Sequence, residues 1–337
     1  MKIIRGVILI LFFAIAMDSS AQQSDEQVRL TAIEFYKKDD FSNAFVVLNN
    51  GLKTNPGSLL LAKELAFTYY LSGSFEQAAR NILPLVERSD ADIQIFQIAG
   101  NIFNGLEDWK QSEKIYKKGL KKYPQSGQLH SEYGQLLWKL EKPSEAIEQW
   151  ESGIIVDPSH AGNYYHASKF YFAAADKTRS IVYGEIFINL ESFSTRTDEI
   201  KYQLYESYKR IFNPADVKIH YLKKTTPFET SMLNGILSFS HLATKGISVS
   251  SLYEIRLGFM KEWFNSNSKT FPFSLFDRMN YLIDNNMFQA YNQWLFGMIS
   301  NESDHQLWII QNQDAYMQFL KFQQNNLYRP KKDEYYF

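Results

Sequence analysis

The chain of 337 residues contains no cysteine, which excludes disulfide bonds, thiolate zinc sites, iron–sulfur clusters and thiol nucleophiles. Glycine (16 residues) and proline (9 residues) are scarce, which argues against a collagen-like, linker-rich or turn-dense all-β chain. Neither sign of charge dominates, because 36 Lys and Arg stand against 37 Asp and Glu, so no basic field exists to hold nucleic acid or an anionic membrane. Apolar residues make up 45% of the chain and aromatic residues 16%, which is enough for one or two packed cores.

Long hydrophobic runs are also missing, except for one at the start of the chain. An apolar run over residues 6–17 follows Lys2 and Arg5, and the small residues 19–21 come after it, directly before Gln22. This order is typical of a secretory signal peptide over residues 1–21, although an uncleaved anchor is the alternative. No Cys follows the run, so a lipoprotein anchor is excluded. We expect an exported protein, periplasmic or associated with the cell envelope, with no stable membrane span after signal cleavage.

A 34-residue period runs through the first half of the chain, in five consecutive windows: 25–58, 59–92, 93–126, 127–160 and 161–194. Two columns of these windows hold small residues. The first column reads Ala32, Ala66, Gly100, Gly134 and Ser168. The second column reads Ala44, Ala78, Ser112, Ala146 and Ser180. Four residues further on, the column reads Leu48, Ile82, Tyr116, Trp150 and Gly184, so it is bulky in all windows but the last.

These columns predict one helix–turn–helix unit per window. Small residues let two helices approach closely, and large residues fill the space beside them. Proline closes three of the windows, at Pro56, Pro124 and Pro158, where it ends the second helix. In the same column, Asp90 and Ser192 are expected to cap the helix that follows.

The signature of small residues, aromatic residues and a closing proline resembles the tetratricopeptide repeat family over residues 25–160. The early tryptophan column of that family is missing, because it reads Val28, Ala62, Phe96, His130 and Tyr164. The fifth window departs further, with Lys177 in place of an aromatic residue. The resemblance implies an all-α, right-handed solenoid of about five repeats over residues 22–212, closed by a capping helix over 197–212. An irregular helical bundle with accidental periodicity is the alternative.

The period is lost after the solenoid, and residues 213–337 predict an all-α C-terminal domain. The helical candidates are 229–243, 248–265, 274–285, 287–299 and 304–325, and residues 217–222 could be extended. Two short runs, 271–273 and 290–296, look similar to the tail of secreted repeat proteins from Gram-negative bacteria, a resemblance that carries no site residues. The last residues, 328–337, are expected to fray, with docking on the body or on a partner as the alternative.

No catalytic constellation is visible in the sequence. A nucleophile elbow, a phosphate-binding loop and a dinucleotide fingerprint are all absent, and the six histidines have no metal-ligand spacing, so we expect neither a metal nor a cofactor. The paired carboxylates Asp39 and Asp40, and Asp90 and Asp92, fall at turns or helix starts, which favours capping over acid/base chemistry. The lysines of segment 114–122 are expected to form a solvated outer face rather than a site for an anionic partner.

The outward-facing side chains of the first helices are amides and aromatic rings, which suit a peptide backbone and supply contact area. They predict a concave partner-binding face of Tyr36, Tyr70, Gln97, Asn101, Asn104, Gln135, Trp138, Tyr165 and Phe172, with an ordinary polar surface as the alternative. Some tetratricopeptide repeat proteins clamp a C-terminal carboxylate with Lys or Arg and Asn. Here Ile33 and Phe67 stand where that pattern has Asn, so binding of chaperone tails is disfavoured.

These observations favour a non-catalytic scaffold or assembly factor of the bacterial cell envelope that binds a protein or peptide and no nucleic acid. The alternative is an enzyme, hydrolase-like, with its site in the C-terminal helical domain. A structural envelope component that associates with itself is a third possibility.

Overall fold

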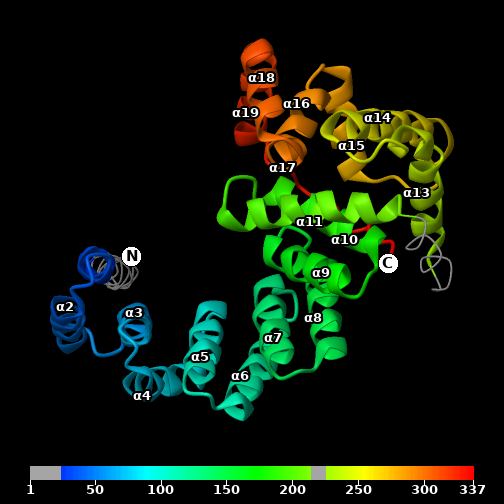
Figure 1. Ribbon diagram of the computed structural model, residues 1–337. Helices are drawn as coiled ribbons and strands as arrows, with labels where there is room; N and C mark the ends of the chain where they lie inside the picture. The colour runs from blue at the N-terminus through cyan, green and yellow to red at the C-terminus, as the bar shows by residue number, and fades with distance from the viewer. Residues whose placement is uncertain (1–23, 214–224) are drawn as a thin grey trace, which may run out of the picture. The chain divides into compact units, whose positions relative to one another are not determined.

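The computed structural model describes residues 24–213 and 225–337, and the regular elements in these two ranges are helices, as predicted (Figure 1). The predicted signal peptide and the segment 217–222 lie outside the described residues. The chain divides into two compact units, one up to Pro124 and one from Gln125 onward. The predicted domain boundary at 212/213 therefore falls inside the second unit. None of the described helices is both long enough and apolar enough to cross a membrane.

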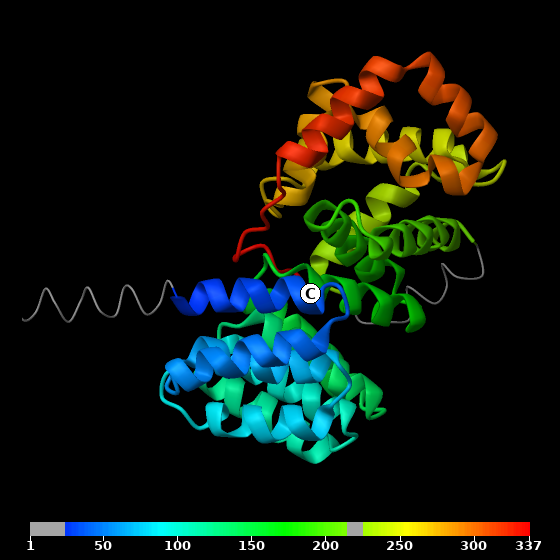
Figure 2. The ribbon, with the colours of Figure 1, turned by 90° about the vertical axis from the view of Figure 1, so that its left-hand side faces the viewer.

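The first unit consists of helix pairs (Figure 2). Residues 24–36 are helical, and they are followed by α2 (Phe41–Thr54), α3 (Leu59–Leu71), α4 (Phe75–Val86), α5 (Ile93–Gly105) and α6 (Trp109–Lys122). The second unit continues the pattern with α7 (Gly127–Lys139), α8 (Pro143–Val156), α9 (Ala161–Ala173), α10 (Lys177–Leu190) and α11 (Thr195–Ile211). The predicted 34-residue period is confirmed, because α3, α5, α7, α9 and α11 begin at residues 59, 93, 127, 161 and 195.

Each of these first helices has its N-terminal cap two residues beyond the closing-proline column. The side chains of Ser58, Asp92, Ser126 and Ser194 each accept a hydrogen bond from a backbone N–H of the first turn. The expectation that Asp90 and Ser192 cap these helices is therefore wrong. Asp90 instead forms an ion pair with Arg88 at 2.8 Å, and the Ser192 hydroxyl donates to the carbonyl of Ile188. The prediction for Asp92 is confirmed.

The turns between the two helices of a pair also repeat. One position of the turn has a left-handed backbone in all five repeats, with φ between 58° and 74°. These residues are Asp39, Gly73, Glu107, Glu141 and Ala175. A left-handed conformation costs a residue with a side chain about 1–2 kcal/mol, and glycine escapes this cost. Only one repeat uses glycine here, so the turn geometry is imposed by helix packing rather than by local preference.

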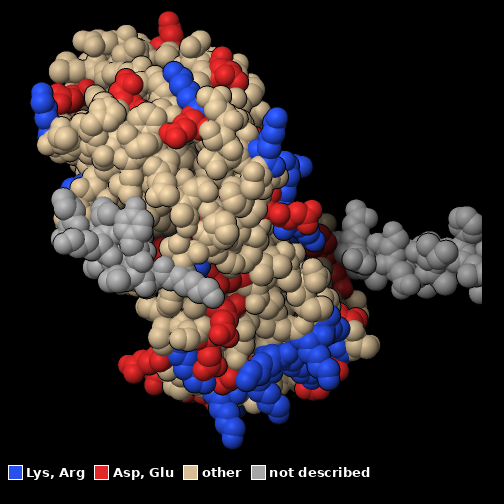
Figure 3. Space-filling view, turned by 90° about the vertical axis from the view of Figure 1, so that its right-hand side faces the viewer, with Lys and Arg blue, Asp and Glu red and all other residues tan. Residues whose placement is uncertain are grey.

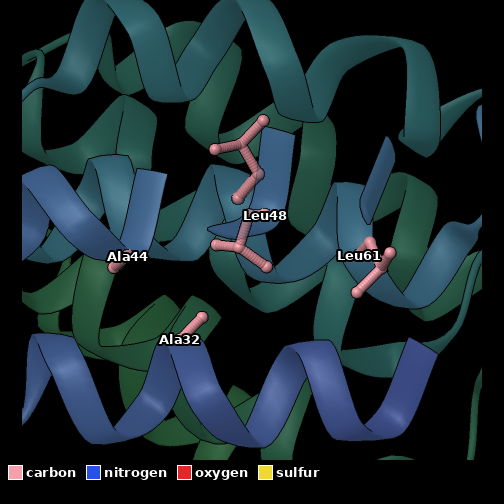
Figure 4. Packing of buried hydrophobic residues seen from close by; sticks show 5 residues of the cluster. Ala32, Ala44, Leu48 and Leu61 are labelled. Carbon is pink, nitrogen blue, oxygen red and sulfur yellow. The ribbon is translucent and has the colours of Figure 1, made fainter. Parts of the chain in front are cut away.

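The two helices of a pair touch through the small columns. The second small column, from Ala44 to Ser180, is completely buried in all five repeats. In the first repeat Ala32, Ala44, Leu48 and Leu61 pack together between residues 24–36, α2 and α3 (Figure 4). In the third and fourth repeats the facing residue is an aromatic ring, and a Cβ atom on Gly100 or Gly134 would come within 2.3 Å of Tyr116 or 2.2 Å of Trp150. Glycine is therefore required wherever the facing residue is aromatic.

The described residues 225–325 are mainly helical, as expected, but the bounds of the helices differ in detail from the prediction. Its elements are α13 (Pro227–Leu237), the 3₁₀ turn η1 (Ser240–Ala243), α14 (Val249–Ser266), α15 (Ser274–Asp284), α16 (Phe288–Asn292), the π-helical η2 (Gln293–Gly297), α17 (Met298–Ser300), α18 (Glu302–Gln311) and α19 (Gln313–Asn325). The expected single helix over 304–325 is wrong. Asn312 leaves the helical conformation, at φ −129° and ψ 33°, and separates α18 from α19.

A buried ion pair joins the repeat helices to the C-terminal helices. Glu185 of α10 and Arg256 of α14 form this pair, and each is only 2% exposed. Arg256 also donates to Asn292 Oδ1 at 2.9 Å. The guanidinium lies within 5.7 Å of ring centres that include Tyr291 and Phe296. This pair therefore links helices on the two sides of the predicted boundary at 212/213 within the second unit.

The C-terminal tail packs against the second unit, so the expected fraying is wrong. The red end of the chain in Figure 1 runs from α19 back toward α10. The ring of Phe337 lies 5.1 Å from that of Tyr183, and Tyr336 stacks on Phe228 at 4.7 Å. Glu334 accepts a hydrogen bond from the backbone N–H of Ser274 at 3.0 Å. Aromatic contacts over this short segment offset the entropy of ordering it.

Candidate binding pockets

A pocket lies along the outward side of the first helices in the first unit, and another in the second unit. The pocket of the first unit measures about 340 Å³, and we name it the Glu64 pocket. It is lined by Arg29, Tyr36, Lys63, Glu64, Phe67, Tyr70, Gln94, Gln97, Ile98 and Asn101. The pocket of the second unit measures about 650 Å³, and we name it the Trp138 groove. It is lined by Gln135, Trp138, Trp150, Tyr165, His166, Lys169, Phe170, Phe172, Ala173, Glu199, Tyr202 and Gln203.

The Glu64 pocket contains a buried carboxylate. Glu64 is 7% exposed, and its Oε1 atom has no hydrogen-bond partner among the described residues. Burial raises the pKa of Glu64, and the hydroxyl of Tyr36 and the charge of Arg29 offset part of that rise. Burial and the neighbouring Glu64 in turn raise the pKa of Tyr36 to about 12, so its hydroxyl keeps its proton at neutral pH.

The Trp138 groove has an exposed aromatic lining. Trp138 is 48% exposed and Tyr202 59% exposed, which is high for such large rings. Trp138 stands edge-to-face with Phe170, with ring centres 6.1 Å apart. The guanidinium of Arg210 covers Phe172 at 4.2 Å from the ring centre. The groove therefore presents apolar surface of the kind that holds aromatic or aliphatic anchors of a partner.

The charged groups at the edge of the groove are paired with one another. Lys169 Nζ lies 2.6 Å from Glu199 Oε1, and the hydroxyl of Tyr165 donates to Glu199 Oε2 at 2.5 Å. Lys169 also donates to the Tyr165 hydroxyl at 3.2 Å. Arg196 lies over the Tyr165 ring at 5.0 Å. This network holds Tyr165 in place, and the two charges of the ion pair compensate each other.

His166 lies in the same groove and is neutral at pH 7. Its ring stacks on Trp150, with ring centres 5.1 Å apart and planes inclined by 18°. Burial lowers the pKa of His166 from 6.5 to about 4, and the nearby positive charges of Arg196 and Lys169 add to the effect. The imidazole therefore serves as a packed ring between Trp150 and the groove.

We expect the second unit to lose stability as the pH falls from about 6.5 to about 4. In this range the unfolded chain takes up a proton on His166 and the folded chain does not, so protonation favours unfolding. The difference between 6.5 and about 4 corresponds to at most about 3 kcal/mol. The variant His166→Phe keeps a ring on Trp150 and removes this titration. Urea unfolding at pH 7 and pH 4.5 should show a smaller acid loss for the variant, and equal losses would contradict the assignment.

The structure places eight of the nine predicted binding residues at these two pockets. Tyr36, Tyr70, Gln97 and Asn101 line the Glu64 pocket, and Gln135, Trp138, Tyr165 and Phe172 line the Trp138 groove. Asn104 lines neither. Whether any of them binds a partner stays a prediction.

Several lining residues were missed by the sequence analysis, above all Glu64, His166, Glu199 and Tyr202. One signal could have revealed Glu64. It occupies the repeat position that holds the apolar residues Leu30 and Ile98 in the neighbouring windows, where a carboxylate is out of place. Glu199 and Tyr202 belong to α11, which the sequence pattern predicts as a capping helix and not as part of a binding face.

The lysines of segment 114–122 are predicted to form a solvated outer face. Acidic side chains lie beside the lysines on the face shown in Figure 3, and Lys117 and Lys118 of α6 pair with Glu113 and Glu87 at 2.6 Å each. Lys122 donates to the carbonyl oxygens of residues 89 and 91.

Within the described part of the chain, no group of three His, Asp or Glu side chains lies close enough together to hold a metal ion.

Comparison with known proteins finds similarity only among solved structures, since no protein-family model and no curated protein matches the chain. A tetratricopeptide repeat protein from Parabacteroides merdae is 16% identical over 71% of this chain and 99% of its own, with a TM-score of 0.43. A thermophilic TPR protein from Thermus thermophilus is 13% identical over 55% of this chain and 98% of its own, with a TM-score of 0.45. The pilF protein of Pseudomonas aeruginosa is 12% identical over 56% and 86%, with a TM-score of 0.48. The helix pairs at 34-residue spacing are the architecture that the resemblance to the tetratricopeptide repeat family predicts, and this prediction is confirmed.

Proposed function

We propose that this chain is a non-catalytic scaffold or assembly factor of the bacterial cell envelope, which binds a protein or peptide partner through the outward faces of its first helices. The observation that carries the proposal is the Trp138 groove. It combines about 650 Å³ of space with two large rings, Trp138 and Tyr202, of which about half the surface is exposed. Exposed aromatic anchors beside a polar edge are a common composition of protein-binding surfaces.

The polar edge of the groove suits an extended peptide. Gln135 is exposed beside Trp138, and its amide can both donate to and accept from a peptide backbone. The Tyr165, Lys169 and Glu199 network is already ordered, so a partner need not order these side chains when it binds. No arrangement among the described residues favours the enzyme alternative.

The envelope part of the proposal rests on the signal-peptide pattern at residues 1–21. If the chain is exported, protein purified from the envelope fraction should begin at Gln22. A chain that still begins at Met1 in that fraction would contradict cleavage.

Peptide selection tests the binding role. A random peptide library is selected on the wild-type chain, and the selected peptides are titrated against Trp138→Ala. We expect about a tenfold or larger loss of affinity, because truncating a ring at the centre of a groove removes a major anchor. Tyr281→Ala is the matched control, because Tyr281 is 49% exposed in the same unit and lies outside the groove. Equal affinity of wild type and Trp138→Ala would overturn the groove assignment.

A further inference from the structure

The chemistry of the Glu64 pocket points to one kind of ligand. Glu64 is only 7% exposed, yet its Oε1 atom lacks a hydrogen-bond partner among the described residues. A buried acceptor without a partner is costly, and folded proteins rarely keep one without a reason. A ligand that donates a hydrogen bond to this atom would remove that cost.

The two cations beside Glu64 are already engaged by other acids. Arg29 donates two hydrogen bonds to Glu26, at 2.9 and 2.6 Å, and its closest approach to Glu64 is 3.7 Å. Lys63 donates to Asp92 at 2.5 Å and to Gln94 at 2.7 Å. Two cations therefore face three carboxylates. Glu64 shares Arg29 with Glu26 and has only the longer, 3.7 Å approach to it, and its Oε1 atom is left without a hydrogen-bond partner among the described residues.

The remaining walls of the pocket are aromatic. The rings of Tyr36 and Phe67 meet edge-to-face at 6.3 Å, and Phe67 and Tyr70 are nearly parallel at 6.1 Å. All three rings line the pocket together with Glu64. Aromatic faces attract cations and cover the methylene groups next to them, so they complement a charged amine.

We propose that the Glu64 pocket binds an alkylammonium group, either a lysine side chain or the free N-terminus of a peptide. The ammonium donates a hydrogen bond to Glu64 Oε1, and its methylene groups lie against Tyr36, Phe67 and Tyr70. A carboxylate or phosphate group is disfavoured at the same place, because Glu64 repels it. The raised pKa of Glu64 falls when the amine binds, so the affinity should increase with pH until Glu64 is fully ionised.

This inference deepens the proposed function, since it rests on the first helices as the binding face and names the chemistry of one pocket. The two can fail separately. The peptide selection tests binding at the Trp138 groove in the second unit, and the amine titration tests binding at the Glu64 pocket in the first unit.

Titration calorimetry of the full chain with three short peptides tests the inference. The first has one central lysine and blocked ends, the second has norleucine in place of the lysine, and the third has a free N-terminus and no lysine. We expect the lysine or the free N-terminus peptide to bind, whichever is the source, and the norleucine peptide not to bind. Glu64→Gln should weaken that binding about tenfold or more, because the charge-assisted hydrogen bond is lost.

Two further variants control for folding and charge. Glu34→Gln removes the same charge from an exposed position on the helical segment 24–36, and its affinity should match wild type. Tyr70→Leu removes one aromatic wall without touching Glu64 and should weaken the amine severalfold. Thermal unfolding of Glu64→Gln checks its fold, which we expect to be intact because glutamine has nearly the same volume.

Three results would overturn the inference. The first is that no amine peptide binds the wild-type chain. The second is that Glu64→Gln binds the amine as tightly as wild type. The third is that a peptide with a blocked N-terminus, no lysine and a free C-terminal carboxylate binds in place of the amine peptides, and that Arg29→Ala weakens its binding. If the amine peptides fail and the library peptides still require Trp138, the proposed function stands and only the inference falls.

Discussion

Replacing Glu185 by alanine is expected to lower the unfolding free energy of the second unit by about 3–5 kcal/mol. The substitution leaves the guanidinium of Arg256 charged in a core where it is 2% exposed and surrounded by aromatic rings. The single hydrogen bond from Arg256 to Asn292 Oδ1 does not replace the lost carboxylate of Glu185. Urea unfolding followed by circular dichroism and by tryptophan fluorescence measures the change.

The double variant Glu185→Met with Arg256→Met separates the pair from its surroundings. Both charges disappear together, and apolar residues of similar length take their place. We therefore expect it to recover most of the loss. Glu206→Ala is the matched surface control, because Glu206 pairs with Lys209 at 2.7 Å where the lysine is 47% exposed, and its loss should cost less than about 1 kcal/mol. If the losses measured for Glu185→Met alone and Arg256→Met alone simply add in the double variant, the pair is not the coupled unit that the structure indicates.

Gly100→Ala is expected to destabilise the first unit by about 1–3 kcal/mol, in spite of the higher helix propensity of alanine. The new Cβ atom would come within 2.3 Å of the Tyr116 ring, so either the ring or a helix must move. Tyr116 is 1% exposed and donates a hydrogen bond to Asn101 at 2.9 Å, and both facts restrict its movement. The measurement is the free energy of unfolding from urea titration.

The other repeats of this chain supply the rescue for Gly100→Ala. Alanine in this column faces Leu48 in the first repeat and Ile82 in the second, so Gly100→Ala with Tyr116→Leu should regain stability relative to Gly100→Ala alone. Gly57→Ala is the control, because its Cβ would meet nothing closer than 3.9 Å. If Gly100→Ala is as stable as wild type, the close contact is not limiting.

The repeat architecture could be predicted because its determinants are local and periodic. Small columns such as Ala44 to Ser180 recur every 34 residues, and each one marks the contact between two helices that are neighbours in sequence. The same periodicity located most of the candidate binding residues, since every first helix presents the same side to solvent. Trp138 and Tyr70 were found in this way.

The errors of the sequence analysis occur where contacts join distant segments. Fraying was expected for residues 328–337, but the ring of Phe337 packs on Tyr183, and no local pattern encodes that contact. The hydrogen bond that the Asn189 side chain donates to the Tyr291 hydroxyl likewise connects positions that are 102 residues apart. One local error remains: Asp90 and Ser192 are predicted as caps, but the caps lie two residues later, at Asp92 and Ser194, because several short polar residues lie near each helix start.

The sequence alone determined that the chain is all-α, where its helix pairs begin and which side of each first helix faces outward, because these properties follow from periodic patterns within 34 residues. Only the tertiary structure decided that Glu64 loses its solvent without gaining a full set of partners, that Glu185 and Arg256 meet inside the second unit, and that α11 completes the Trp138 groove. The physical reason is that burial and ion pairing depend on which surfaces meet after folding, and a one-dimensional pattern fixes a residue's face without fixing what covers it.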